Sequence, residues 1–130
     1  MATNKKMFSS GNLEVSGGTT KWLTYNNIRV QGSYEYRACI IFDKLKEKGM
    51  ILDWSKSKLR IPYIGEDNKK HSYLVDFDIL TNSNKILRVE TKGYVQPKDL
   101  LKWKAAREQS HKILVFMGKH LDQIENKLKI

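Results

Sequence analysis

Two carboxylates and one lysine are spaced along the chain so that they could meet on one face of a β-sheet. Asp76 lies in the segment 72–80 (SYLVDFDIL), and Glu90 and Lys92 lie in the segment 86–92 (ILRVETK). Both segments have the alternating pattern of strands, and the short polar stretch between them predicts a hairpin. Glu90 and Lys92 are two residues apart and therefore point to the same side of their strand. The spacing thus predicts a cluster of Asp76, Glu90 and Lys92.

Such a cluster is suited to metal-dependent phosphodiester chemistry. Neighbouring carboxylates repel each other, and Mg²⁺ relieves this repulsion because it takes carboxylate oxygens together with water and substrate phosphate. A lysine beside the metal can orient or stabilise an attacking hydroxide. On spacing alone, however, the three residues fit equally well a cross-strand salt bridge on a solvated sheet face. Asp78 shares a face with Asp76 but lies about 7 Å further along, so we expect it either to be structural or to support the site without binding the metal itself.

Helical and strand-like segments follow one another in the order helix, three strands, helix, strand, helix. The patterns predict helices over 33–48 and 97–109, strands over 58–64, 72–80, 86–92 and 112–117, and a closing helix marked by Leu121, Ile124 and Leu128. Ser33 is the expected N-cap of the first helix, and Gly49 is its expected stop. Pro62 argues for an edge strand or a bulge, and the strand over 112–117 is apolar enough to be buried. This order predicts an α/β fold whose mixed central sheet is flanked by helices.

The beginning of the chain has a different character. Residues 1–20 are rich in Ser, Gly, Thr and Asn and show no sustained period, which is typical of a loop. Trp22, Leu23 and Tyr25 are candidates to anchor the neighbouring segment to the core. We interpret residues 1–32 as a partly flexible arm that serves dimerisation or DNA contact. Residues 33–130 are then a single domain.

The charge balance favours a polyanionic partner. The chain has 130 residues and a formal net charge of +10, of which residues 91–130 carry +5, whereas residues 61–90 carry −1. This favours nucleic acid or an acidic membrane surface as partner, although no apolar run approaches the roughly 20 residues of a membrane span. The single cysteine, Cys39, excludes an intrachain disulfide framework and a multi-cysteine zinc site and suits a reducing cytoplasm.

The sequence around the acidic cluster resembles the PD-(D/E)XK nuclease superfamily. Over residues 33–117, the strand RIPYI, the strand YLVDFDI, the sequence ETKG and a basic helix ending in REQ look like phage endonuclease I-type (Holliday-junction resolving) enzymes. Phage head-completion nucleases and transposase-associated TnsA-like nucleases share much of this pattern. Val75 stands where the motif usually has proline, but valine also keeps the strand extended. The resemblance implies a PD-(D/E)XK restriction-endonuclease-like core (αβββαβ).

The resemblance also implies roles for individual residues. Asp76 and Glu90 would bind Mg²⁺, for which Mn²⁺ can substitute, and the backbone carbonyl of Thr91 would be a third ligand. Lys92 would position the attacking water. Glu35, in the SYEYR segment, would bind a second metal or order the hydrated first one. The expected reaction is DNA cleavage that leaves 5′-phosphate ends, with no small-molecule cofactor.

Basic residues outside this cluster are candidates for phosphate contacts. They lie at the start of the first predicted strand and along the second predicted helix: Lys58, Arg60, Lys98, Lys102 and Arg107. Duplex DNA has two strands to cut, so we expect a homodimer. We therefore expect a phage-encoded, structure- or site-limited DNA endonuclease that acts in the host cytoplasm. Its rivals are a homing or head-completion nuclease of the same fold and a non-catalytic DNA-binding or packaging protein.

Overall fold

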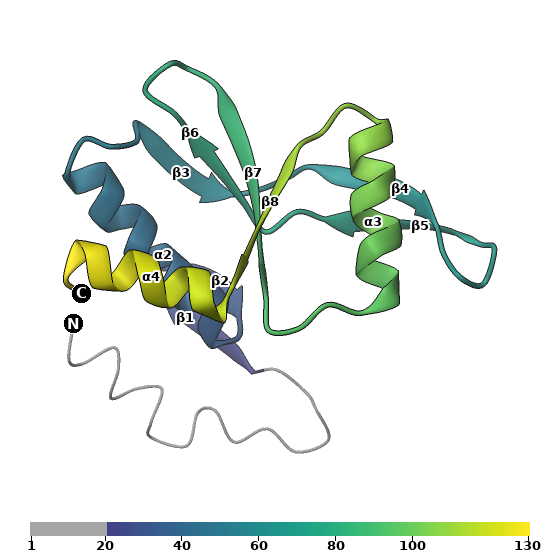
Figure 1. The fold of residues 1–130 in the computed structure, drawn as a ribbon, viewed down its shortest axis with the longest axis horizontal. Helices are drawn as coiled ribbons and strands as arrows, with labels where there is room; N and C mark the ends of the chain where they lie inside the picture. Colours follow the sequence, from purple (N-terminus) through teal and green to yellow (C-terminus); the bar gives the residue numbers. More distant parts are fainter. Residues whose placement is uncertain (1–20) are drawn as a thin grey trace.

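A four-stranded mixed sheet forms the centre of the protein in a computed structural model, which describes residues 21–130 (Figure 1). The strand order is β3 (Asp53–Lys56), β6 (Phe77–Leu80), β7 (Ile86–Lys92) and β8 (Ile113–Met117). β3, β6 and β7 are antiparallel neighbours, and β8 runs parallel to β7. Helix α3 (Pro97–Glu108) connects the parallel pair, which needs a crossover of this kind. The predicted mixed α/β architecture is thereby confirmed.

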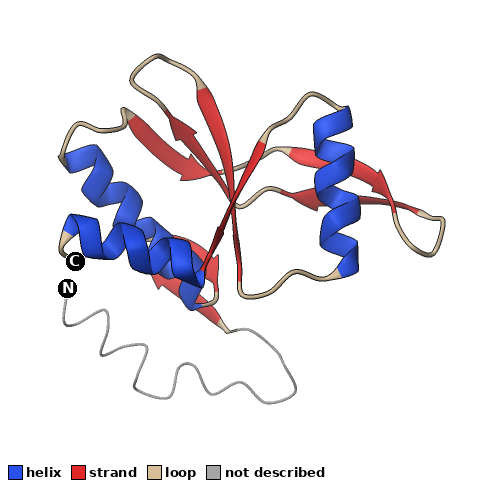
Figure 2. Ribbon diagram, in the orientation of Figure 1, coloured by secondary structure: helices blue, strands red, loops and turns tan. Residues whose placement is uncertain are grey.

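The helices cover the sheet from two sides. Helices α2 (Ser33–Glu47) and α4 (Gly118–Leu128) pack on each other, whereas α3 lies with the hairpin of β4 (Arg60–Ile64) and β5 (Lys70–Leu74) (Figure 2). Two apolar clusters result. The larger one joins α2, α4 and the sheet through residues such as Phe42, Phe77 and Val89. The smaller one lies under α3 and contains Ile61, Tyr73, Val75 and Ala106.

Helix α2 follows the predicted pattern, with one correction at its start. Ala38, Ile41 and Phe42 are completely buried, as their helical spacing predicts. The N-cap is Gly32 and not Ser33 as predicted, and no side chain caps the helix. The chain passes directly from β2 into α2 at residue 32, where φ is +92°, a conformation that glycine adopts without strain. Gly49, at φ +74°, ends the helix region as expected.

Residues 22–31 form a hairpin that belongs to the folded core. β1 (Trp22–Tyr25) pairs with β2 (Ile28–Gln31), and Asn26 and Asn27 make the turn with positive φ at both positions, as a tight hairpin requires. Leu23, Tyr25 and Val30 are buried against α2, so two of the three predicted anchors are confirmed. Trp22 is instead 55% exposed. The expected arm thus differs from the structure over residues 22–31, and its first 20 residues lie outside the described part of the chain.

The predicted strand over 72–80 is two strands in two sheets. β5 ends at Leu74 and pairs with β4, whereas β6 begins at Phe77 and enters the central sheet. Between them, the N–H of Val75 donates to the carbonyl of Leu59, and the carbonyl of Asp76 accepts from the N–H of Ser57. The alternation was nevertheless predicted correctly, because Tyr73, Val75, Phe77 and Ile79 are all buried.

The central sheet therefore differs from the predicted meander. The strand beside β6 is β3, which sequence patterning missed because it has only four residues and a charged residue at each end. The predicted strand over 58–64 pairs only with β5, in agreement with the edge position that Pro62 requires. β8 is half-buried along its whole length and not fully buried as predicted, because it is the last strand of the sheet. No helix of residues 21–130 is long and apolar enough to cross a membrane.

If the β1–β2 hairpin is part of the core, Val30→Ala should lower the free energy of unfolding by about 2 kcal/mol, because the Val30 side chain is completely buried. Trp22→Ala is the control in the same hairpin. Its exposed ring, which contacts Arg29, should contribute no more than about 0.5 kcal/mol. Urea unfolding of both variants measures the difference, and equal effects would show that the hairpin is not docked.

Candidate active site

The structure brings Asp76 and Glu90 together at the end of the β6–β7 pair. The register pairs Phe77 with Val89, so the next position outward sets Asp76 opposite Glu90. Glu90 is only 5% exposed, and Asp76 is half-buried where the chain changes sheets. One Asp76 oxygen, Oδ2, accepts hydrogen bonds from the N–H of Thr91 at 2.9 Å and from its hydroxyl at 3.3 Å. The predicted pairing of these two carboxylates is present.

Burial and mutual repulsion make both carboxylates hard to ionise. Burial, together with the negative charge of Glu35, raises the pKa of Asp76 to about 6. Burial and the charge of Asp76 raise the pKa of Glu90 to about 8. The nearby Lys92 ammonium lowers both pKa values without cancelling these effects. Two carboxylates in this state gain strongly from a cation placed between them.

Lys92 lies at this site but is held by a residue that sequence reasoning missed. Its Nζ is 2.9 Å from Oδ1 of Asp99, whose side chain is buried in the first turn of α3. The other oxygen of Asp99, Oδ2, accepts from the N–H of Gln96 and completes a capping box. Burial alone would raise the pKa of Asp99, but the Gln96 N–H and Lys92 hold that pKa below its ordinary value. The sequence signal for this cap was Gln96, which directly precedes Pro97 and is followed three residues later by Asp99.

A second lysine and a tyrosine complete the buried polar cluster. Lys102 Nζ lies 3.9 Å from Asp99 Oδ1 and 5.5 Å from the centre of the Tyr73 ring. Burial and the neighbouring Lys92 lower the pKa of Lys102. The Tyr73 hydroxyl is buried without a hydrogen-bond partner, and burial together with the charges of Glu90 and Asp76 raises its pKa. Tyr73 was not among the residues predicted for the site.

Glu35 reaches the edge of this cluster from the first turn of α2. Its Oε1 is 3.0 Å from Nζ of Lys56 and accepts from the N–H of Gln31 at 3.2 Å. Its charge acts on Asp76, but within residues 21–130 no three His, Cys, Asp or Glu side chains converge closely enough to form a metal cage. Asp78, on the same face as Asp76, pairs with Arg88 at 2.6 Å, in agreement with its expected structural role.

The residues present fit Mg²⁺ as a two-carboxylate site. Mg²⁺ is commonly bound by one or two carboxylates and keeps several waters, so it does not require a third acidic ligand. Asp76 and Glu90 supply hard oxygen ligands with raised pKa values, and the unpartnered Tyr73 hydroxyl beside them can hydrogen-bond to a hydrated ion. Thr91 contacts Asp76 through its N–H and hydroxyl, and the ligand role of its carbonyl stays a prediction.

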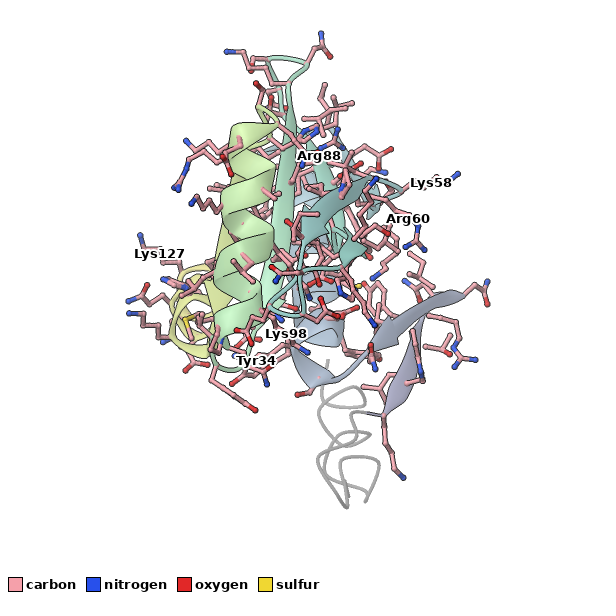
Figure 3. All side chains as sticks on the ribbon, turned by 90° about the vertical axis from the view of Figure 1, so that its right-hand side faces the viewer. Tyr34, Lys58, Arg60, Arg88, Lys98 and Lys127 are labelled. Carbon is pink, nitrogen blue, oxygen red and sulfur yellow. The ribbon has the colours of Figure 1, made fainter. Side chains whose placement is uncertain are left out.

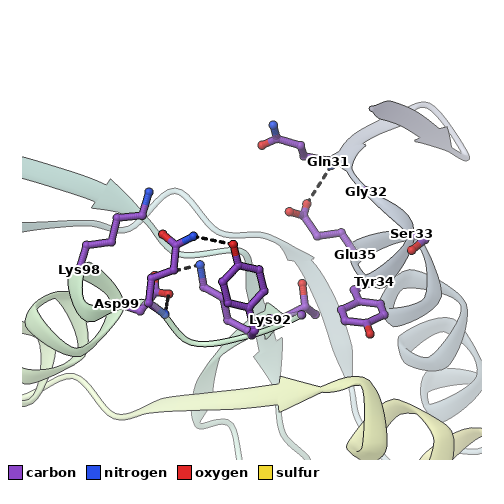
Figure 4. A pocket seen from close by; sticks show the side chains of 12 residues that line it. Gln31, Gly32, Ser33, Tyr34, Glu35, Lys92, Lys98 and Asp99 are labelled. Atoms are coloured by element: carbon purple, nitrogen blue, oxygen red, sulfur yellow. Dashed lines mark hydrogen bonds and ion pairs between the residues drawn. The ribbon is translucent and has the colours of Figure 1, made fainter. Parts of the chain in front are cut away.

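A pocket of about 560 Å³ opens beside these residues. It lies between the first turns of α2 and α3, with Glu35 on one side, Lys98 and Asp99 on the other, and Lys92 between them (Figure 4). Lys98 is exposed at its edge. Lys92 therefore lines a pocket that is open to solvent.

The basic residues that were predicted to contact phosphates do not form one patch. Lys58 and Arg60 are exposed and project from the β4–β5 side of the molecule (Figure 3), whereas Lys98 lies on the α3 side of the pocket, across from Tyr34 (Figure 4). Arg107 is exposed near the end of α3. Lys102 differs from the expectation of a surface contact, because only 18% of its side chain is exposed and its ammonium faces Asp99.

Comparisons with known proteins return no relationship. The chain matches no protein-family profile, no curated protein and no solved structure. The resemblance to PD-(D/E)XK nucleases stays a prediction that rests on the quoted motifs.

Stability without metal should fall as the pH rises. The folded-state pKa of Glu90 is about 8, against an ordinary value of 4.5, so the folded protein retains a proton that the unfolded chain has lost. The contribution is complete below the ordinary pKa and is lost as the pH rises toward about 8. Thermal unfolding in EDTA should therefore give a lower Tm at alkaline than at mildly acidic pH. Glu90→Gln should flatten this dependence, and added Mg²⁺ should restore the alkaline Tm; an unchanged pH profile in the variant would contradict the raised pKa.

The Lys92–Asp99 pair can be separated from the capping function of Asp99. Asp99→Asn keeps an oxygen that accepts from the Gln96 N–H but leaves Lys92 without its counter-charge, which should cost about 2 kcal/mol of unfolding free energy because Lys92 is partly exposed. The control, Gln96→Ala, removes one half of the capping box and should cost about 1 kcal/mol or less. Urea unfolding distinguishes them, and an Asn variant as stable as wild type would show that the ion pair contributes nothing.

Proposed function

We propose that the protein is a Mg²⁺-dependent DNA endonuclease that hydrolyses phosphodiester bonds. The observation that carries this proposal is the pair of largely buried carboxylates, Asp76 opposite Glu90, with Lys92 two residues further along the same strand as Glu90. Two adjacent carboxylates with raised pKa values are costly for a fold that has no use for them, and such groups concentrate at functional sites. The resemblance of VDFDI and VETKG to nuclease motifs gives the same reaction class.

The roles follow from where each side chain lies. Asp76 and Glu90 would hold Mg²⁺, which supplies positive charge at the phosphate and lowers the pKa of a bound water. Lys92 would orient the attacking water, and Asp99 holds the Lys92 ammonium in an ion pair. The water oxygen bonds to phosphorus as the bond to the 3′ oxygen breaks, which leaves a 5′-phosphate and a 3′-hydroxyl. Glu35, paired with Lys56, acts on the site through its charge.

DNA is the proposed partner because the net charge of +10 is spread around an acidic centre. Exposed Lys98 stands at the pocket edge, and exposed Lys58, Arg60 and Arg107 are available to contact phosphates elsewhere. Such contacts bind the backbone and do not by themselves select a sequence. A homodimer would present two such sites to the two strands of a duplex.

A non-catalytic DNA-binding protein is the second candidate. It is favoured by the ion pairs that already neutralise Lys92 and Glu35, through Asp99 and Lys56 respectively. Such a protein would bind DNA with strong salt dependence but would leave its phosphodiester bonds intact.

Plasmid nicking tests the two candidates directly. Asp76→Asn, Glu90→Gln and Lys92→Ala should each reduce the Mg²⁺-dependent nicking rate by at least about a hundredfold. Asp78→Asn is the matched control, because Asp78 lies on the same strand face but pairs with Arg88, and it should nick at close to the wild-type rate. Circular dichroism verifies that each variant is folded. Nicking by Lys92→Ala at the wild-type rate would refute the assignment, and wild-type protein that binds but never nicks would favour the non-catalytic candidate.

A further inference from the structure

Two tyrosines from different elements line the pocket beside the carboxylates. Tyr34 comes from the first turn of α2, and Tyr94 comes from the segment between β7 and α3. Lys92 and Gly93 also line the pocket, and Lys98 adds a positive charge at the edge (Figure 4). The pocket thus combines aromatic surface with the exposed Lys98, and the two carboxylates of its lining, Glu35 and Asp99, are already paired with Lys56 and Lys92.

Tyr94 is an exposed ring that is held in place. The residue is 70% exposed. Among the large apolar and aromatic residues in the described part of the chain, this is the highest exposed fraction. Its hydroxyl accepts a hydrogen bond from Nε2 of Gln96 at 3.0 Å, and Gln96 itself is fixed by the α3 capping box. Neighbouring Val95 and Leu100 are also exposed, at 40% and 58%. The ring therefore contributes little to the core and offers its surface to a ligand.

Tyr34 is fixed by close contacts with backbone. A Cβ atom at Gly118 would lie 2.8 Å from the Tyr34 hydroxyl oxygen, and one at Gly93 would lie 3.6 Å from a ring carbon. The Arg37 guanidinium lies 5.6 Å from the ring centre. A larger residue at position 118 would thus require the Tyr34 ring to shift. The ring is half-buried and lines the pocket.

We propose that this pocket takes an unpaired nucleobase of the DNA strand, next to the phosphate that is cut. This inference rests on the proposed function and names its substrate class. Aromatic side chains bind bases of single strands by stacking, and cations beside them bind the adjoining phosphates, which is the combination that Tyr34, Tyr94 and Lys98 provide. Bases inside a duplex are stacked on each other and cannot enter a side pocket unless they are flipped out. The favoured substrates are therefore single strands and single-stranded flaps.

Binding without metal tests the proposal independently of cleavage. Fluorescence anisotropy in EDTA at fixed salt compares a labelled oligothymidylate strand, a duplex of mixed sequence, and that duplex with a single-stranded flap. Wild-type protein should bind the strand and the flap about tenfold more tightly than the duplex. Tyr94→Ala should remove most of this preference and leave duplex affinity unchanged, whereas Tyr94→Phe, which keeps the ring, should retain it.

A tyrosine outside the pocket provides the matched control. Tyr63 stacks on His71 in the β4–β5 hairpin, and Tyr63→Ala should leave the preference intact. A fluorescent purine analogue placed in the flap should be quenched by wild-type protein and by Tyr94→Phe but not by Tyr94→Ala. Equal wild-type affinity for duplex and flap, or equal losses on both with Tyr94→Ala, would overturn the pocket assignment. If the protein nicks DNA but shows no such preference, the endonuclease proposal holds and the base-binding pocket is refuted. If it shows the preference but does not nick DNA, the base-binding pocket holds and the endonuclease proposal is refuted.

Discussion

The rest of the structure is organised around the repulsion between Asp76 and Glu90. Their positions face each other in the register of two neighbouring strands, and each carboxylate is sufficiently removed from water that its pKa is raised. Replacing either residue should stabilise the metal-free fold, because burial and the neighbouring charge oppose the ionisation of both carboxylates. The fold surrounds the pair with partial compensations, which are hydrogen bonds from Thr91 and from the Asp76 backbone and the ammonium groups of Lys56, Lys92 and Lys102.

The chain path explains how this pair is kept from open solvent. At Val75 and Asp76 the chain leaves the β4–β5 hairpin and enters the central sheet, so Asp76 lies at a junction of two sheets and not in the middle of a strand. The hairpin and α3 then build the smaller apolar cluster, to which Tyr73 and Val75 belong. Helix α3 also places Asp99 against Lys92, and so a capping residue of the crossover helix positions a lysine of the sheet. Stability of α3 and geometry of the site are consequently coupled.

Charge is distributed in two layers. Inside, the acidic groups are matched with lysines: Asp99 with Lys92 and Lys102, and Glu35 with Lys56. Outside, cations such as Lys58, Arg60, Lys98 and Arg107 remain exposed. This arrangement is compatible with the proposed polyanionic partner, because the outer cations would attract it and the inner carboxylates would supply oxygen ligands for the proposed metal ion. The Tyr73 hydroxyl is buried without a hydrogen-bond partner in the same region.

The sequence by itself determined the order of most elements, the inward face of the strands and the pairing of Asp76 with Glu90, because these depend on local periods and on a short hairpin. It also indicated the acidic centre in a basic chain, since charge and spacing are properties of the sequence. Tertiary structure alone decided that the strand over 72–80 divides between two sheets, that β3 takes the place beside β6, and that residues 22–31 join the core. It alone decided that Lys92 and Lys102 converge on Asp99. These features arise from contacts between distant segments, in which hydrogen-bond partners and burial are set by packing and leave no periodic trace in the residues that make them.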